Sequence, residues 1–177
     1  ISCKNLKFHL LNSGGLFNFP KHRFNIIRTG ISIYGIMPNL NSSNKLKPIM
    51  EFKAPIVHIK KISYGEKVGY GCTYIASKNM NIAIVQCGYA DGLLKCFEKG
   101  GSVFYNNLKF SIIGRISMDL FAIDCNDYNF NLNDELTIWG GEHAESKIEY
   151  LSLKYNIIPY VFLTSLSNRV ERFYEIK

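Results

Sequence analysis

The sequence predicts a mixed fold: the end of an α/β unit, followed by a mostly β domain of barrel or sandwich type with short helices near its C-terminus. Residues 1–38 alternate short apolar strands with a glycine-rich turn of helix, and residues 39–50 are polar and rich in Asn, Ser and Pro. Residues 51–177 contain many short runs of β-branched and aromatic residues. Such spacing is typical of a β-barrel or sandwich, so we expect a linker at 39–50 between two structural regions.

The first region has the order strand, helical turn, strand, which is typical of a parallel α/β unit. Residues 6–11 form the first expected strand, and Ser13 is well placed to cap the turn that follows and that Pro20 closes. Residues 24–28 form the second strand. Two such strands cannot stand alone, and the chain opens in what reads as the middle of a domain. We therefore expect the protein to begin earlier, or its other half to be a separate chain.

The region after the linker is expected to be rich in strands. They are residues 55–62, 80–87, 103–105, 108–113, 120–125 and 135–139. The third and fourth would form a hairpin across Asn106-Asn107. Further along, apolar positions at helical spacing predict short helices over residues 146–155 and 160–166, and residues 169–174 would form a closing strand.

Composition and charge argue against several classes of protein. The formal charge is +7, but the lysines are scattered rather than arranged in a stripe with aromatic residues, so a solvated basic surface is favoured over nucleic-acid binding. Five cysteines form an odd set without a Cys-x-x-Cys pair: Cys3, Cys72, Cys87, Cys96 and Cys125. That pattern argues against a disulfide framework and a metal site, and favours the cytoplasm. No apolar run approaches the roughly 20 residues of a membrane span, and no signal peptide is visible.

Four polar segments could carry chemistry, although each also has an ordinary explanation. Residues 12–15 (Asn-Ser-Gly-Gly) place a hydroxyl at a helix N-terminus, which suits a phosphate but is also a common N-cap. Residues 28–35 (Arg-Thr-Gly-Ile-Ser-Ile-Tyr-Gly) put an arginine at a strand end, either as in an α/β-barrel site or as in a surface turn. In residues 65–74, Tyr70 lies between two glycines and is free to project, although a packing tyrosine at a strand edge is the commoner arrangement.

The fourth segment has two parts, residues 88–92 (Gly-Tyr-Ala-Asp-Gly) and 114–119 (Gly-Arg-Ile-Ser-Met-Asp). Each puts a carboxylate beside a glycine turn, so Asp91 and Asp119 could be Asx-turn residues, and Arg115 could pair with Asp119. Each signal is weak by itself, but the joint order of the four segments is specific. From about residue 9 to its end, the chain closely resembles the C-terminal half of bacterial alanine racemases.

The resemblance implies a fold-type III enzyme, in which an N-terminal (β/α)8 barrel holds pyridoxal 5′-phosphate and a β-rich domain follows. Residues 1–38 would then be the last strands of that barrel. The positions that match the cofactor's phosphate site and its surroundings are Asn12, Ser13, Gly30 and Ile31. Arg28 matches the arginine that faces the pyridine nitrogen. Because a guanidinium does not release its proton, that nitrogen would stay unprotonated.

The resemblance also implies an activity, the two-base interconversion of L- and D-alanine, which would supply D-alanine for peptidoglycan. Tyr70 matches the tyrosine that exchanges the α-proton on one face of alanine, and the cofactor lysine, which has no counterpart in this chain, serves the other face. Met118 matches the residue whose backbone helps bind the substrate carboxylate, and Tyr89 a tyrosine lining the path by which substrate enters. In the family this catalytic tyrosine extends into the partner's active site, so a head-to-tail homodimer is implied.

Two positions depart from the family pattern. Asn168 stands where some members have a phosphate-contacting tyrosine, and Ser117 where some have a cysteine. Without the lysine, the chain alone is expected to be inactive and to need the N-terminal half. The alternatives are a broad-specificity amino-acid racemase, a catalytically inactive remnant or non-enzymatic β-domain, and a basic β-barrel retained on DNA in a salt-dependent way.

Overall fold

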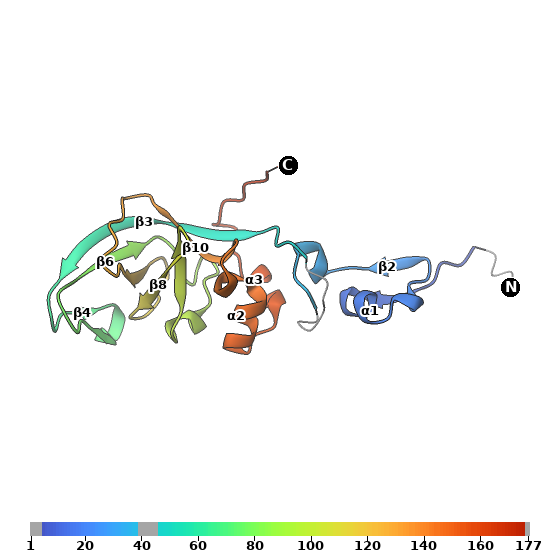
Figure 1. The fold of residues 1–177 in the computed structure, drawn as a ribbon, viewed down its shortest axis with the longest axis horizontal. Helices are drawn as coiled ribbons and strands as arrows, with labels where there is room; N and C mark the ends of the chain where they lie inside the picture. Colours follow the sequence, from blue (N-terminus) through green and yellow to red (C-terminus); the bar gives the residue numbers. More distant parts are fainter. Residues whose placement is uncertain (1–4, 39–45, 176–177) are drawn as a thin grey trace. The chain divides into compact units, whose positions relative to one another are not determined.

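The computed structural model describes residues 5–38 and 46–175 and divides the chain into two compact units, residues 1–50 and 51–177 (Figure 1). Residues 39–45 of the expected linker, and Cys3, lie outside the described residues. Each unit is described by itself. The second is mostly β with few helices, as the sequence predicts.

The first unit contains a parallel pair of strands with short helical turns between and after them. Its elements are β1 (His9–Asn12), α1 (Ser13–Asn18), η1 (Pro20–His22), β2 (Ile26–Arg28) and η2 (Ile31–Tyr34). β1 and β2 are parallel, with His9 opposite Ile26. The pair is incomplete as a sheet, because every residue of β2 is exposed. Buried apolar side chains are few among the described residues of this unit: Leu11, Ile31 and Ile36.

The expected cap of α1 is wrong by one residue. Asn12, not Ser13, is the N-cap: its Oδ1 accepts the N–H of Gly15 at 2.9 Å. Asn and Ser are both favoured at this position, so local sequence could not separate them. The Ser13 hydroxyl forms hydrogen bonds across to the loop after β2 instead.

Six antiparallel strands of the second unit close into a barrel, in the order β10-β3-β6-β9-β8-β7. Their bounds are β3 (Glu51–Ile62), β6 (Met80–Val85), β7 (Ser102–Tyr105), β8 (Leu108–Ile113), β9 (Phe121–Asp124) and β10 (Glu135–Gly140). The long strand β3 (cyan in Figure 1) pairs with both β10 and β6. Each strand contributes at least one side chain that is no more than 1% exposed, so the core lies inside the barrel.

The β7–β8 hairpin forms across Asn106 and Asn107 as predicted. Both residues have positive φ, 48° and 62°, which is the backbone of the two-residue turn that joins twisted antiparallel strands. Asn tolerates this conformation better than other residues with a β-carbon, which explains the pair in the sequence. A second hairpin, β4 (Lys67–Val68) with β5 (Tyr74–Ile75), was not predicted, because strands of two residues leave no periodic pattern.

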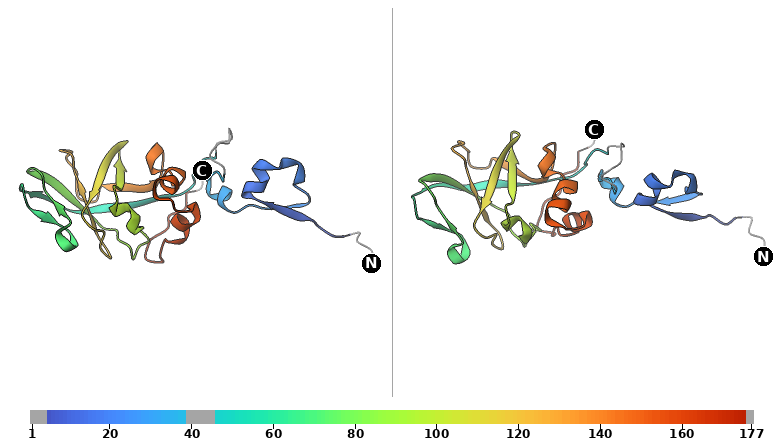
Figure 2. Two further views of the ribbon diagram at one scale, coloured as in Figure 1. Left: turned by 90° about the horizontal axis from the view of Figure 1, so that it is seen from below. Right: turned by 60° about the horizontal axis from the view of Figure 1, so that its bottom comes forward.

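Short helices follow the barrel strands, and the two views of Figure 2 place α2 and α3 at the opposite end of this unit from the β4–β5 hairpin. They comprise η4 (Lys95–Glu98), η5 (Ala144–Ser146), α2 (Ile148–Tyr155) and α3 (Pro159–Thr164). α2 buries Ile148 and Leu151, as the helical spacing predicts. The expected closing strand over residues 169–174 is wrong: the segment has no strand pairing. The barrel is already closed and offers it no edge.

Candidate active site

Tyr70 lies at the tip of the β4–β5 hairpin, in the short helical turn η3 (Tyr70–Cys72). Its side chain is 72% exposed. The base of the hairpin is fixed, because Val68 and Ala76 belong to a buried cluster with residues of β3, β6, β8 and β9. The hairpin therefore presents a tyrosine to its surroundings from a rigid base.

Two glycines let this turn pack directly on the loop after β8. Gly69 and Gly71 both have positive φ, 76° and 71°. A β-carbon on Gly69 would lie 3.2 Å from the backbone nitrogen of Arg115, and one on Gly71 would lie 3.3 Å from the guanidinium of the same residue. The backbone conformation favours glycine at both positions, and the close approach leaves little room for a β-carbon. The contact fixes Tyr70 relative to the loop that carries Met118.

The loops that carry Met118 and Tyr89 are joined through their backbones. Tyr89 N–H donates to the Ser117 carbonyl at 3.1 Å, and Ala90 N–H donates to the Met118 carbonyl at 3.0 Å. Both side chains are about half exposed, Met118 by 51% and Tyr89 by 50%. The Met118 carbonyl already accepts a hydrogen bond from Ala90. The backbone N–H of Met118 is therefore the group that a ligand could use. The structure brings the loops of all three predicted residues of this unit, Tyr70 included, into one neighbourhood.

The expected ion pair between Arg115 and Asp119 is not formed. Asp119 pairs with Arg169, whose Nη2 lies 2.6 Å from Asp119 Oδ1 and whose Nε lies 3.3 Å from Asp91 Oδ1. Arg115 instead lies against Gly71. Asp91 also forms a hydrogen bond within its own turn, as expected of an Asx-turn residue: its Oδ2 accepts Gly88 N–H at 2.8 Å. Arg169 belongs to none of the four motif segments, so nothing in the sequence pointed to this contact.

In the first unit, several hydrogen-bond donors meet at Ser13. Its Oγ accepts the Gly30 N–H at 2.9 Å, the Ser32 N–H at 3.4 Å and the Ser32 hydroxyl at 3.0 Å. A hydroxyl oxygen has two lone pairs, so three donors compete for two acceptor positions. An anion with several oxygens, such as a phosphate, would satisfy this set better. Ser32 was missed by the sequence analysis, although it follows Gly30 by only two positions.

The remaining predicted residues of this unit lie around that cluster. Ile31 is 3% exposed and adjoins Gly30, and Asn12 precedes Ser13 as the cap of α1. Arg28 ends β2 with an exposed side chain, whose Nη2 donates to the Leu10 carbonyl at 3.4 Å. A guanidinium at a strand end and a cluster of donors fit a cofactor with a phosphate and a ring nitrogen.

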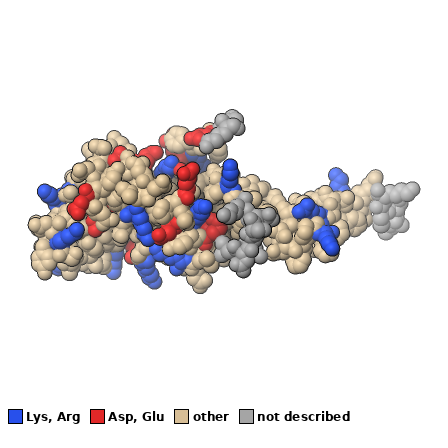
Figure 3. Space-filling view, in the orientation of Figure 1, with Lys and Arg blue, Asp and Glu red and all other residues tan. Residues whose placement is uncertain are grey.

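The charges are distributed unevenly between the two units. Residues 1–50 contain seven Lys or Arg and no Asp or Glu, whereas residues 51–177 contain fourteen of each. The whole formal charge of +7 therefore belongs to the first unit. On the face in Figure 3, acidic and basic side chains mix over the β-domain, and only basic ones show on the first unit. The contrast comes from the acidic residues, all of which lie in the second unit, while the lysines are spread along the whole chain. No carboxylate side chain of the first unit would oppose a phosphate.

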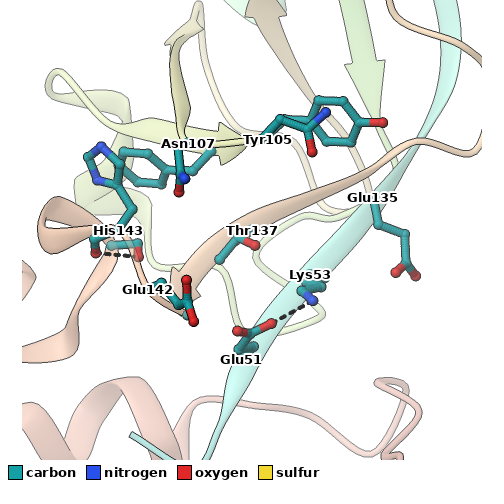
Figure 4. Close-up of a pocket in the computed structure, with 12 residues that line it drawn as sticks. Glu51, Lys53, Tyr105, Asn107, Glu135, Thr137, Glu142 and His143 are labelled. Atoms are coloured by element: carbon teal, nitrogen blue, oxygen red, sulfur yellow. Dashed lines mark hydrogen bonds and ion pairs between the residues drawn. The ribbon is translucent and has the colours of Figure 1, made fainter. Parts of the chain in front are cut away.

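A separate hollow of about 280 Å³ lies on the second unit, beside β3 and β10. Polar and charged side chains line it, including a Glu51–Lys53 ion pair of 2.5 Å, and its labelled residues are shown in Figure 4. The hydrogen bond to Glu51 is the main reason that the pKa of Lys53 is raised. His143 stacks on Phe104 at its edge, with 4.1 Å between the ring centroids. The pocket contains none of the candidate cofactor-binding, substrate-binding or catalytic residues named from the sequence.

Three further findings bear on the expectations from composition. The cysteines that the structure describes are free thiols, and burial raises the pKa of Cys125 to about 11. Within residues 5–38 and 46–175, no cluster of three or more His, Cys, Asp or Glu is placed to hold a metal ion. In the same part of the chain, no helix has the length and apolar character needed to cross a membrane.

Comparisons with known proteins assign this fold. The family model described as "Alanine racemase, C-terminal domain" matches residues 49–174. The alanine racemase of Vesicomyosocius okutanii is 37% identical over 93% of this chain and 46% of its own length, and that of Rickettsia bellii is 38% identical over 96% and 42%. The chain therefore spans about half the length of the curated relatives it matches.

Solved structures give the same result. The alanine racemase of Bartonella henselae, with covalently bound pyridoxal phosphate, aligns with a TM-score of 0.87 at 31% identity, over 97% of this chain and 47% of that protein. That of Clostridium difficile 630, in complex with cycloserine, aligns with a TM-score of 0.85 at 31% identity, over 92% and 44%. Family model, relatives and structures agree, and the chain belongs to the alanine racemase family, whose C-terminal domain it carries.

Proposed function

We propose that this chain is the C-terminal part of a pyridoxal-phosphate-dependent alanine racemase and interconverts L- and D-alanine only together with an N-terminal half that supplies the cofactor lysine. The observation that carries the proposal is an exposed tyrosine held between two glycines on a rigid hairpin, in a chain of this family. The half-length match to complete racemases supports the need for a second half. The exposed strands of the first unit support a role as the end of a barrel that is completed elsewhere.

In this proposal the first unit binds the cofactor. Ser13, Gly30 and Ser32 supply the donors for its phosphate, and the absence of any acidic residue from 1 to 50 removes repulsion. Arg28 would lie at the ring nitrogen and would leave it unprotonated, because a guanidinium holds its own proton. Pyridoxal phosphate, when bound, supplies the electron-withdrawing ring that acidifies the α-proton of alanine. The solved relative with bound pyridoxal phosphate supports this choice of cofactor.

The second unit supplies one of the two bases. Racemisation needs one group to remove the α-proton and another to return a proton to the opposite face. The phenol oxygen of Tyr70 serves one face, and the lysine outside this chain serves the other. Because the ring projects from its own domain, it is suited to enter the site of a second subunit, which gives a head-to-tail homodimer. The Met118 N–H would bind the substrate carboxylate, and Tyr89 would border the path to the site.

The experiment co-expresses this chain with a lysine-bearing N-terminal half of a family member and measures racemisation of L- and D-alanine. Tyr70→Phe should lower the rate by about 10²- to 10⁴-fold, the usual contribution of a positioned acid–base group. Tyr64→Phe is the matched control, because Tyr64 is also exposed, by 76%, and lies near the same hairpin. It should retain activity.

The same preparation separates the alternatives. A complex that binds the cofactor but racemises no amino acid would support an inactive remnant. Comparable rates on larger amino acids would indicate a broad-specificity racemase. Cell fractionation of the source organism would test the cytoplasmic location that the reduced cysteines suggest.

A further inference from the structure

Arg169 connects two loops of the candidate site that are far apart in sequence. Its Nη2 lies 2.6 Å from Asp119 Oδ1 and its Nε lies 3.3 Å from Asp91 Oδ1. Asp119 directly follows Met118, and Asp91 lies two positions after Tyr89. One guanidinium therefore contacts both loops for which the proposed function has a role.

The segment that carries Arg169 is itself fixed to one of these loops. Ser165 Oγ donates to the Gly92 carbonyl at 3.0 Å, and Ser167 N–H donates to the Asp91 carbonyl at 3.2 Å. A β-carbon on Gly92 would lie 2.5 Å from the Ser165 carbonyl oxygen, so the two backbones are in direct contact. Arg169 thus starts from an anchored backbone, which reduces the entropy lost when its side chain is ordered.

The two carboxylates depend on this arginine. The Asp91 side chain is only 16% exposed and Asp119 is 45% exposed, and both face the same cation. Without it, two negative charges would remain close together, one of them largely out of water, where an unpaired charge is costly. Asp91 also holds the turn of the Tyr89 loop through Gly88 N–H. Loss of the cation should therefore disturb both loops.

We propose that Arg169 is a positioning residue of the racemase site, which sets the loop of Met118 against the loop of Tyr89. The inference rests on the proposed function, which says what the site does. The contacts of Arg169 are observed in this chain. Arginine is suited to the task because its planar guanidinium presents Nε–H and Nη–H donors in a fixed fork. Lysine offers one compact charge on a flexible stem and cannot hold both carboxylates in the same geometry.

The first test measures backbone hydrogen exchange in the 177-residue chain itself. Arg169→Gln and Arg169→Lys should speed exchange in residues 88–92 and 117–120, with the larger effect in the glutamine variant. Strands β3, β6 and β9 should exchange as in the unchanged protein. Arg172→Gln is the matched control, because Arg172 is exposed and makes no ion pair among the described residues. Unchanged exchange in both loops, or equal loss of protection throughout the barrel, would overturn the proposal.

The second test measures kinetics in the complex with the lysine-bearing half. Arg169→Gln should raise the KM for alanine by about tenfold with a smaller change in kcat, because the loop of Met118 would bind the substrate carboxylate less well. Arg169→Lys should recover part of this loss, and Arg172→Gln should match the unchanged protein. A fall in kcat with constant KM would contradict a positioning role through the carboxylate-binding loop.

A third comparison tests whether Arg169 acts through its ion pair with Asp119 or only through its positive charge. If Arg169 acts through Asp119, then adding Asp119→Asn to Arg169→Gln should change KM much less than the same substitution does in the unchanged protein. If the two substitutions changed KM additively, the proposed action of Arg169 through Asp119 would be rejected. If the complex showed no racemisation at all, the proposed function would fail, while hydrogen exchange would still decide whether Arg169 orders the two loops.

Discussion

The two units differ in how complete they are. The second closes its six strands into a barrel with a core of fully buried side chains, and its fourteen acidic residues match its fourteen basic ones. The first has two short strands, few buried side chains and seven basic residues without an acidic one. A sheet needs more strands or a covering layer to be stable in water. The residues proposed to bind the cofactor thus lie on the incomplete unit, and the proposed base lies on the complete one.

This difference fits the proposal that the chain depends on an N-terminal half and on a second subunit. The first unit has exposed apolar residues on both strands, including Leu10, Ile26 and Ile27, which a neighbouring part of a barrel would bury. Burial of such side chains is worth about 1.5–3 kcal/mol each, so completion would be strongly favourable. The second unit needs no such completion to fold. Its exposed Tyr70 adds little to the buried core, which leaves it free for the chemical role proposed above.

The largest expected effect comes from separating the units. Residues 51–177 expressed alone should keep a cooperative thermal unfolding transition, because the barrel and its core lie within them. Residues 1–50 alone should show no such transition, since the two strands and three buried apolar side chains among the described residues of this unit cannot offset the loss of chain entropy. Circular dichroism during a temperature ramp measures both. A cooperative transition in the fifty-residue piece would remove the contrast between the units.

A single added methyl group should test the complete unit from within. In Gly88→Ala the new β-carbon would lie 2.1 Å from the Met118 carbonyl oxygen and 2.4 Å from Asp119 N, both backbone atoms that cannot easily move. We expect the free energy of unfolding to fall by about 3 kcal/mol, in the range of severe overpacking. Urea denaturation of residues 51–177 measures it.

Gly100→Ala is the control for that substitution. Gly100 also lies in a turn and has a positive φ of 73°, but nothing lies within 4 Å of a β-carbon there. Gly100→Ala should lower the free energy of unfolding only by the strain of a left-handed backbone at alanine, about 1–2 kcal/mol. Equal costs at the two positions would mean that the loops of Tyr89 and Met118 do not pack as closely as their hydrogen bonds indicate.

Local patterns account for what the sequence could predict. The Asn106-Asn107 turn, the strands around it and the buried face of α2 each depend on neighbours within a few positions, and they were correctly predicted. The strand expected over residues 169–174 failed because it was inferred from the local sequence alone, while the absence of a free sheet edge is a property of the whole barrel.

The candidate site shows the same division. Tyr70, Met118 and Tyr89 were proposed from an ordered set of motifs, and the structure shows what each loop contacts. Arg169 could not be found in this way, because its partners lie 50 and 78 positions earlier and neither spacing follows a secondary-structure period. The charge contrast between the units was present in the sequence, but it emerges only when the boundary near residue 50 is drawn.

The smallest expected effect concerns the paired charges of the second unit. Lys109 Nζ lies 2.6 Å from Glu145 Oε2, and this hydrogen bond is the main reason that the pKa of Glu145 is lowered. A lowered pKa adds stability that is fully present above the unfolded value of 4.5 and is lost as the pH falls through the folded value. Glu145→Gln should therefore cost less than about 1 kcal/mol at pH 7, because both side chains are partly exposed and screened by water.

Urea denaturation at pH 7 and pH 3 checks this pair and sharpens the contrast between the units. The difference between Glu145→Gln and the unchanged protein should shrink at pH 3, and also at pH 7 in about 1 M salt, where the Debye length is only about 3 Å. Glu142→Gln is the control, because Glu142 is exposed and makes no ion pair among the described residues. If the difference persisted at pH 3, packing rather than charge would hold Glu145. Acid would then destabilise the second unit through other pairs, whereas the first unit, which has no carboxylate side chain, can lose no such contribution.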